Sequence, residues 1–486
     1  MITPWIAVVT VIAYLAILFT ISYFTSRKAD NAGFFVGGRN SSWIVVAIAT
    51  IGSTISGVTF VSVPGMVQVS HFAYLQMVMG FVAGQIIIAF VLVPLYYKLK
   101  LVSVYEYLKE RFGMGSYHTG AWFFFVSKML GASVRFFLVC LTLQILIFAP
   151  LGIPFALNAL VTTFVVWLYT YRGGVKTVIW TDLFKTMCLV LSVVLCIYFI
   201  AVEMGYDWSG VTHAVFGNKM SQTFFFDDVN DKKYFFKQFF AGVFTIIATT
   251  GLDQDLMQRN LSCKNSNESR KNMIVSILMQ FVVIALFLML GVLLYIYAAH
   301  IGPELTQCHG DELFTKIATG GYLPMIVGIL FLIGLVAAAF GAAGSALTAV
   351  TTSFTVDILN ADRTDEKTTA HKRRWVHMGM ALLMAVVIYV FNMLNNTSVI
   401  DAVYILASYT YGPILGMFAF GICMKQRVRD KYIPLVAILA PVLCFILDRN
   451  SVDWFDGYQF SYELLILNAA FTFVGLCFLI KKKQSS

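Results

Sequence analysis

The sequence predicts an all-α polytopic membrane protein with about 13 transmembrane helices in one transport domain. Three observations predict this class. Hydrophobic residues make up 59% of the 486 residues and charged residues only 12%, about half the charged share of an average soluble domain. Apolar runs of about 20 residues, long enough to span a bilayer core, recur along the whole chain. Lysines and arginines gather in alternate loops, as they do where basic loops stay in the cytoplasm.

The composition also excludes other classes. A mean hydropathy of +0.80 leaves too little polar surface for a soluble globule of this length, and it is far above the range of disordered chains. The net charge of +9 follows from the basic loops, so we expect no nucleic acid partner. The eight cysteines are spread mostly through apolar segments and form no disulfide framework. We find no phosphate-binding loop of the Walker type.

In chain order, each span is predicted from an apolar run that ends at polar or basic residues. The first run lacks a basic leader and a cleavage site, so we expect a true span and not a signal peptide. The predicted spans are 4–25, 43–69, 73–97, 118–149, 152–170, 175–204, 236–257, 272–299, 322–358, 375–394, 399–424, 432–448 and 461–480. The distribution of basic residues places the N-terminus outside and the C-terminus in the cytoplasm.

Two of these spans contain small and polar residues that interrupt an apolar helix. The second span carries the stretch Gly52–Thr59, and the seventh carries Ala248–Gly251 followed by two aspartates, Asp253 and Asp255. Interrupted helices five spans apart are typical of inverted repeats that bind a solute near the middle of the membrane. Close helix packing through small residues is the alternative explanation.

Five motifs in order resemble those of the sodium:solute symporter family. They are Phe34–Arg39 (FFVGGR), Val104–Leu108 with Arg111-Phe112, Gly173–Asp182, Asp253-Gln254 with Gln258-Arg259, and Phe354–Asp357 (FTVD). The resemblance implies a leucine-transporter-like fold of two inverted five-helix repeats. We expect one transport domain over 1–486, with a leading helix (1–30), repeat 1 (43–204), repeat 2 (236–424) and two C-terminal helices (432–480).

The resemblance implies a secondary active symporter that imports a small polar solute by alternating access. The solute is an organic anion if Arg135 binds a carboxylate. The solute classes are sugars, sialic acid and carboxylates, and the coupling ion is Na⁺. A membrane-embedded enzyme and a channel are the alternatives from other classes. We expect a small-molecule solute and the lipid bilayer as partners, no obligatory protein partner, and a bacterial inner membrane as the location.

Ionisable residues inside the spans are costly and therefore indicate function or pairing. Asp182 and Lys185 lie on one face of the sixth span, where an ion pair that stabilises packing is one interpretation. By resemblance, Asp182 helps to bind a second sodium ion. Lys128 is expected to pair or to reach the interface, and Asp253 and Asp255 to mark a helix boundary.

The sequence departs from the family pattern at the main sodium site. The hydroxyl pair that holds this ion falls on Gly341-Ala342, whereas the nearby Ser345 is kept, and Lys185 replaces a glutamine. The hypothesis is that the Lys185 ammonium takes the place of the main sodium ion, which would give a sodium-independent or a proton-coupled cycle.

The remaining site residues are implied by the resemblance. Sodium ligands fall on Gly52, Ile55 and Ala338, in addition to Asp182 and Ser345. Arg135 matches an arginine that binds a solute carboxylate, and pairing with a carbonyl or with Asp182 is the alternative. Solute contacts also fall on Thr54, Ser56 and Thr59, and an aromatic gate falls on Tyr74.

Overall fold

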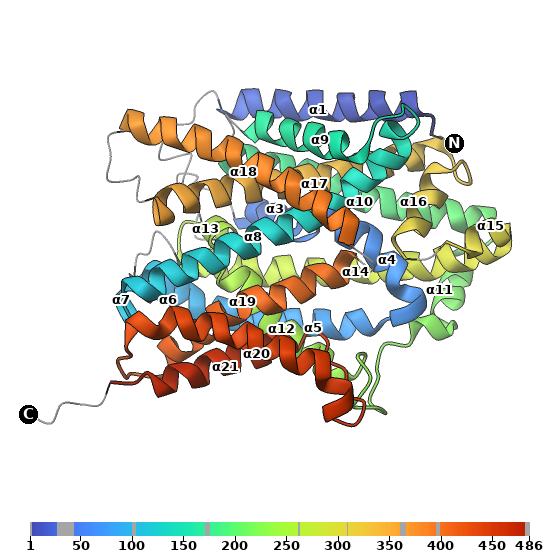
Figure 1. Ribbon diagram of the computed structural model, residues 1–486. Coiled ribbons are helices and arrows are strands. Elements are labelled where there is room, and N and C mark those ends of the chain that lie inside the picture. Colours follow the sequence, from blue (N-terminus) through green and yellow to red (C-terminus); the bar gives the residue numbers. More distant parts are fainter. Residues whose placement is uncertain are drawn as a thin grey trace, which may run out of the picture.

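The chain folds into a bundle of long helices whose axes run roughly side by side (Figure 1). The structure is a computed structural model that describes residues 2–26, 43–99, 104–170, 175–260, 263–308, 310–359, 366–394 and 399–481. Within these residues we find no β-strand, only an isolated antiparallel bridge between Val428 and Ile480. The motif at Phe34–Arg39 and the pair Gly173-Gly174 lie outside the described ranges.

The helices follow the predicted spans closely. They are α1 (Pro4–Ser26), α3 (Trp43–Thr54), α4 (Gly57–Ser70), α5 (Ala73–Ile87), α6 (Val93–Leu99), α7 (Glu106–Arg111), α8 (Met114–Leu143), α9 (Phe155–Thr170), α10 (Val175–Glu203), α11 (Trp208–Phe216), α12 (Phe235–Ile246), α13 (Gln254–Asn260), α14 (Ser266–Ile301), α15 (Pro303–Thr306), α16 (Asp311–Thr319), α17 (Met325–Ser353), α18 (Glu366–Leu394), α19 (Val399–Cys423), α20 (Ile433–Trp454) and α21 (Leu464–Phe478).

Short π-helical turns extend several of these helices. They are η2 (Ile88–Leu92), which joins α5 to α6, η3 (Gln144–Phe148) after α8, η5 (Ile247–Gly251) after α12 and η6 (Phe354–Ile358) after α17. Such turns place an extra residue in the helical ladder and are frequent at functional sites. The turn η5 interrupts the helix that the sequence predicts to be broken.

Among the described residues, nine helices are long and apolar enough to cross a membrane, and the bent pair of α3 and α4 makes a tenth. Three shorter apolar helices, 155–170, 235–251 and 464–478, occupy the remaining predicted spans. The multi-pass all-α class is confirmed, and every predicted span coincides with a helix. The exact number of crossings stays a prediction.

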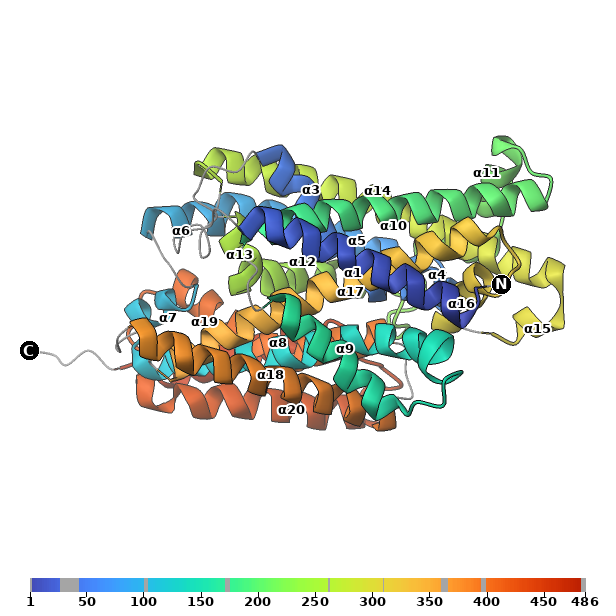
Figure 2. The same ribbon diagram turned by 90° about the horizontal axis from the view of Figure 1, so that it is seen from above.

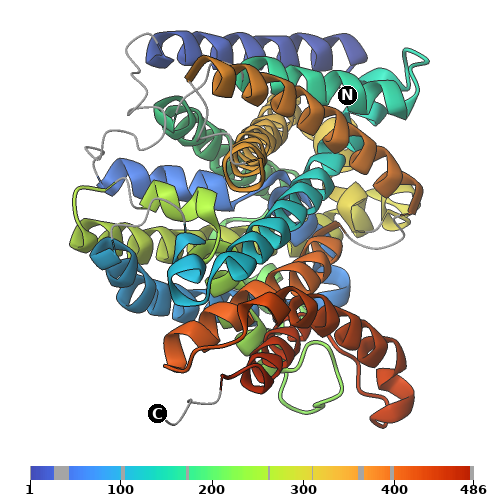
Figure 3. The same cartoon turned by 60° about the vertical axis from the view of Figure 1, so that its left-hand side comes forward.

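Helix α17 forms the centre of the bundle, and α1 and α20 lie at its edges. α17 packs against α8, α10 and α18, and most of its residues between Val327 and Val350 are buried. In the most apolar 18-residue stretches of α1 and α20, only 22% of the residues are buried. These helices therefore present their apolar side chains to lipid. Figures 1 and 3 place α1 and α20 at opposite edges of the molecule.

The helices α5 and α12 approach each other to backbone contact. A Cβ atom added to Gly80 would lie 2.1 Å from the carbonyl oxygen of Phe239, and one added to Gly242 would lie 2.1 Å from that of Met77. Small residues permit this close packing, which is how membrane helices gain attraction without a hydrophobic driving force. The contact fixes α12, whose end carries the second helix break.

Candidate solute and ion site

The first helix break lies between α3 and α4, where the sequence predicts it. α3 ends at Thr54 and α4 begins at Gly57, and the two axes are bent by 59°. Ser56 is the N-cap of α4, because its hydroxyl accepts a hydrogen bond from the backbone N–H of Thr59. Polar and small residues thus end one helix and start the next in the interior of the bundle.

The second break follows η5, at Leu252 and Asp253. The carbonyl oxygen of Gly251 accepts a 2.9 Å hydrogen bond from the Tyr96 hydroxyl, and that of Leu252 accepts a 3.0 Å bond from Tyr105. The Gln254 side chain accepts a 2.7 Å bond from the N–H of Val104. Two of the motifs found in the sequence, 104–108 and 253–259, therefore contact each other and satisfy the backbone of the interrupted helix.

Both breaks border one cavity of about 130 Å³. The cavity is lined by residues of α3, α5, α8, α10, α12, η5, α13, α14, α17 and α19, and Figure 2 shows α3 and α14 on the opposite side of the bundle from α8. Its ionisable lining residues, apart from tyrosines, are Lys128, Arg135, Asp182, Asp253 and Asp255. Several charges facing one enclosed space in a membrane protein indicate a path for a polar solute.

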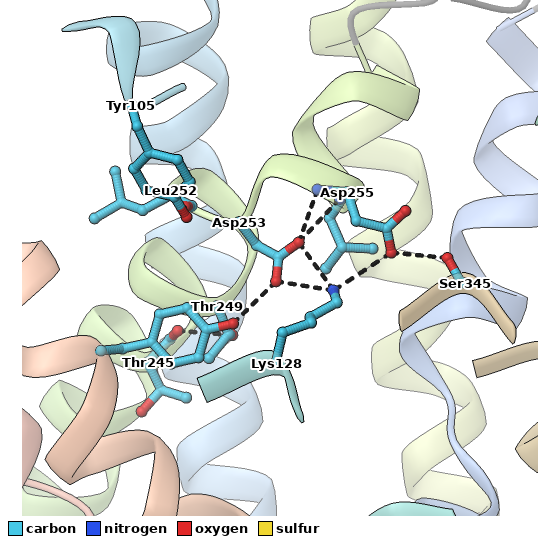
Figure 4. Close-up of polar contacts among 10 residues, drawn as sticks. Tyr105, Lys128, Thr245, Thr249, Leu252, Asp253, Asp255 and Ser345 are labelled. Atoms are coloured by element: carbon cyan, nitrogen blue, oxygen red, sulfur yellow. Dashed lines mark hydrogen bonds and ion pairs between the residues drawn. The ribbon is translucent and has the colours of Figure 1, made fainter. Parts of the chain in front are cut away.

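A network of largely buried ion pairs lines the cavity at α13 (Figure 4). The Lys128 ammonium lies 2.9 and 3.0 Å from the two carboxylate oxygens of Asp253 and 3.3 Å from an oxygen of Asp255. The same Asp255 oxygen accepts a 2.8 Å hydrogen bond from the Ser345 hydroxyl, and Asp253 accepts one of 2.9 Å from Tyr411. The network joins α8, α13, α17 and α19.

Asp253 has a second, local role in this network. Its Oδ1 atom accepts hydrogen bonds from the backbone N–H groups of Asp255 and Leu256, so that Asp253 caps α13. The predicted helix-boundary role of Asp253 is therefore confirmed, and so is the expected pairing of Lys128. The sequence gives Lys128, Asp253 and Asp255 separate roles and predicts no contact among them. The need of buried charges for partners is the signal that could have paired them.

Asp182 and Lys185 meet α17 at the position of Gly341. The Lys185 ammonium lies 3.8 Å from an oxygen of Asp182, and both side chains are almost fully buried. A Cβ atom added to Gly341 would lie 3.7 Å from this ammonium and 3.3 Å from the Asp182 carboxylate. A Cβ atom on Gly52 would lie 2.6 Å from the carbonyl oxygen of Asp182. Three elements thus converge around this ion pair: the end of α3 at the first helix break, α10 and α17.

A cluster of tyrosines from α5, α19 and the turn before α21 lies beside another part of the cavity. The hydroxyls of Tyr74 (α5) and Tyr404 (α19) share a 2.7 Å hydrogen bond. The rings of Tyr404 and Tyr462 lie 5.0 Å apart, and the Tyr462 hydroxyl donates a hydrogen bond to Asp401. Tyr404 lines the cavity, whereas Tyr74 is buried behind it. This cluster is the place of the predicted aromatic gate.

The structure brings only some of the predicted site residues to the cavity surface. Thr54, Arg135, Asp182 and Ser345 line it. The predicted residues that do not line it are Ser56, Thr59, Tyr74, Gly52, Ile55, Ala338 and Lys185. Ser56 and Thr59 have hydroxyl oxygens 3.4 Å apart at the start of α4, within hydrogen-bonding distance. Their assigned contacts with a solute stay predictions, as do the sodium ligands.

Comparison with known proteins places this architecture in a family. The model of the sodium:solute symporter family matches residues 34–431. The sodium/sialic acid symporter NanT of Aliivibrio fischeri is 26% identical over 92% of this chain and 88% of its own length. The symporter SiaT of Proteus mirabilis is 24% identical over 93% and 92%. The human sodium-coupled monocarboxylate transporter 2 is 24% identical over 82% of this chain and 64% of its own length.

Solved structures agree with the predicted fold. A Na⁺-coupled sialic acid symporter in an outward-open state superposes with a TM-score of 0.82 at 18% identity and covers 97% of both chains. The nucleobase-cation symporter Mhp1 superposes with a TM-score of 0.53 at 12% identity, over 92% of this chain and 94% of its own. The leucine-transporter-like fold is thereby confirmed, while the repeat boundaries stay predictions. The chain therefore belongs to the sodium:solute symporter family, and it is a sodium-coupled transporter of a small organic solute and not an enzyme.

Proposed function

We propose that the protein imports an organic anion whose carboxylate binds Arg135 in the cavity. The single observation that carries the proposal is the environment of this side chain. Arg135 faces the cavity from α8, and among the described residues we find no hydrogen bond or ion pair to its guanidinium. A carboxylate matches the planar fork of guanidinium in shape and charge.

The position of Arg135 in the membrane supports this assignment. Arg135 lies well inside the helix formed by α8 and η3 (114–148). An arginine at such depth carries a free-energy cost unless an anion or polar group neutralises it. Pairing of Arg135 with Asp182 is the alternative, but Asp182 forms an ion pair with Lys185 at 3.8 Å. The relatives NanT, SiaT and the monocarboxylate transporter are named for solutes that are organic acids.

Uptake into proteoliposomes tests the proposal. A panel of labelled sugars, sialic acid and carboxylates is offered with and without an inward sodium gradient. We expect uptake of an acid and not of neutral sugars, and Arg135→Gln should reduce it at least about 100-fold, the equivalent of about 3 kcal/mol for a charge-assisted pair. Arg449→Gln, which removes an exposed arginine of α20, is the matched control. Equal uptake by Arg135→Gln and the wild type would refute the proposal.

We also propose that the Lys185 ammonium replaces the main sodium ion of the family, so that the transported ion is the second sodium ion, at Asp182. The position of Lys185 supports this second proposal, because its ammonium lies beside Asp182 and next to Gly341, where the family pattern has a hydroxyl. A buried ammonium keeps the charge that the ion would supply and links α10 to α17. A single sodium ion would then be transported in each cycle.

Sodium titration separates the two ion schemes. In the wild type we expect uptake to rise with sodium along a curve with a Hill coefficient near one. The variant with Lys185→Gln, Gly341→Ser and Ala342→Ser should restore two ligand hydroxyls and raise this coefficient above one. The proposal fails if removal of sodium abolishes uptake and Lys185→Gln leaves the sodium dependence unchanged. Uptake that persists in the absence of sodium would instead favour the sodium-independent or proton-coupled cycle.

The orientation and location complete the proposal. The alternation of basic loops supports an external N-terminus and a cytoplasmic C-terminus, and Figure 1 shows α1 beginning at the opposite end of the bundle from the end of α21. With this orientation, the tyrosine cluster faces outward and the Lys128 network faces the cytoplasm. The bacterial relatives NanT and SiaT support a bacterial inner membrane. We propose no obligatory protein partner.

A further inference from the structure

We propose that the loop between α11 and α12 inserts an aromatic face into the membrane, at the boundary between lipid acyl chains and headgroups. This face, here called the aromatic anchor, consists of Phe224, Phe226, Phe235, Phe236 and Phe240. With the orientation proposed above, it enters the outer leaflet. None of these residues lines the cavity, so the aromatic anchor is a surface separate from the solute and ion site.

The loop presents its aromatic side chains alternately outward and inward. Phe224 and Phe226 are 48% and 52% exposed, whereas Phe225 between them is less exposed. The backbone N–H of Phe225 donates a 3.3 Å hydrogen bond to the side-chain oxygen of Gln76 in α5, which holds this part of the loop against the bundle. Side chains two residues apart share one face of an extended segment. Phe224 and Phe226 therefore point out of the protein together.

The exposed rings of the loop continue onto α12. The rings of Phe224 and Phe226 are stacked, with centroids 6.1 Å apart and planes at 6°. Phe226 lies 4.9 Å from the ring of Phe235 and 6.3 Å from that of Phe236. Phe236 and Phe240, one helical turn apart, are stacked at 6.3 Å and are about half exposed. Because α12 lies in a predicted span, the loop extends a surface that faces lipid.

The polarity of the loop changes abruptly after Phe226. The residues that follow include three aspartates, Asp227, Asp228 and Asp231. The carboxylate of Asp228 accepts a 2.8 Å hydrogen bond from the backbone N–H of Asn230, so this charged part forms a turn of its own. A segment that lies at a membrane surface places its apolar side in the boundary region of the lipid and its charged side in water. The loop has both sides, next to each other.

The position of the loop favours lipid as the partner over another protein. Figures 1 and 3 show the green loop before α12 at the edge of the bundle, beside the red helix α20. The ammonium of Lys237 lies 3.2 Å from the carbonyl oxygens of both Asn230 and Gln459, and 3.6 Å from the centre of the Tyr458 ring. These contacts join the loop to the turn that follows α20. The aromatic anchor is therefore continuous with an edge helix that is exposed to lipid.

The accessibility of a spin label in proteoliposomes tests the proposal. Cys423→Ser and Cys477→Ser first remove the two native cysteines that are not buried. A nitroxide is then attached to the variants Phe224→Cys and Phe226→Cys. Electron paramagnetic resonance measures its collisions with oxygen, which concentrates in acyl chains, and with nickel ethylenediaminediacetate, which stays in water. At both positions we expect collisions with oxygen to exceed those with the nickel complex.

Two control positions calibrate this ratio. Val229→Cys lies in the same loop beyond the change in polarity, and the native side chain is 55% exposed, so collisions with the nickel complex should dominate there. Val9→Cys on α1, where the valine is 64% exposed, should give the ratio of a position in lipid. The two loop variants should resemble Val9→Cys and differ from Val229→Cys.

The remaining outcomes would overturn the proposal. A ratio at Phe224→Cys and Phe226→Cys equal to that at Val229→Cys would place the aromatic anchor in water. Low collision rates with both reagents would mean that a protein surface, such as a second copy of this chain, covers it. If one of the two variants does not fold, the other reports on the same face, because the two rings are stacked.

Discussion

The buried network around Lys128 gives a sharp prediction about stability. The cluster holds one ammonium and two carboxylates, so it carries a net charge of −1 when Asp253 and Asp255 are ionised. Lys128→Met keeps the length of the side chain but removes the ammonium from both the Asp253 and the Asp255 carboxylate. Asp253→Asn keeps an acceptor oxygen for the backbone and Tyr411, and it leaves one ammonium facing one carboxylate.

The magnitudes follow from the distances. At an effective dielectric constant of about 20, contacts of 2.9 and 3.3 Å correspond to gross attractions of about 6 and about 5 kcal/mol. Lys128→Met loses both, and after protonation and relaxation we expect a net loss of about 3–5 kcal/mol. Asp253→Asn should cost only about 1–2 kcal/mol, because it also removes the uncompensated charge. The double variant, which combines Lys128→Met with Asp253→Asn, should be at least about 1.5 kcal/mol more stable than Lys128→Met alone.

Unfolding in a titration of SDS against a mild detergent measures these free energies. Several native cysteines are buried, among them Cys140, Cys196 and Cys444. A fluorophore that reacts with thiols as they become exposed therefore reports unfolding, and no cysteine has to be introduced by mutation. Lys109→Met removes an exposed lysine of α7 and serves as the control. A double variant less stable than Lys128→Met, or a loss below about 1 kcal/mol for Lys128→Met, would refute the charge argument.

Three further predictions concern other parts of the fold. Burial raises the pKa of Asp311, the first residue of α16, above the ordinary value of 3.8. Between these two pKa values the folded chain retains a proton that the unfolded chain releases, so stability falls as the pH rises from 3.8 to the raised pKa. Asp311→Asn should therefore raise the unfolding temperature at pH 7 and have a vanishing effect as the pH approaches 3.8. Gly80→Ala places a methyl group against the backbone of α12 and should cost about 1–3 kcal/mol, whereas Gly379→Ala, which meets no neighbour, should be neutral or stabilising in the same SDS titration. Tyr74→Phe and Tyr404→Phe remove the same 2.7 Å hydrogen bond, so each should lower stability by about 1 kcal/mol, and the double variant by little more than either.

The spans and the two breaks could be predicted because they depend on local sequence. Apolar runs have to be about as long as a bilayer is thick, and stretches such as Gly52–Thr59 contain residues that end helices. The same reasoning locates Asp253 at a helix boundary, since an aspartate before a helix caps its N–H groups. The structure agrees with these expectations at the ends of α3, α4 and α13.

The partners of side chains from distant helices could not be predicted in the same way. Lys128 and Asp253 are separated by 125 positions, and no local pattern brings α8 beside α13. The solute contacts of Ser56 and Thr59 stay predictions, and in the structure their hydroxyl oxygens lie 3.4 Å apart at the start of α4. Whether a hydroxyl faces a cavity or its own helix depends on side-chain packing that the sequence pattern does not specify.

The ionisable side chains around the cavity balance one another. In the described part of the chain, Lys128 and Arg135 line the cavity together with Asp182, Asp253 and Asp255, and Lys185 lies beside Asp182, which gives three positive and three negative groups. A carrier whose interior is electrically neutral when empty returns across the bilayer without moving net charge through the membrane voltage. The voltage then acts only on what the carrier loads, so a monoanion that travels with one sodium ion would cross without generating current.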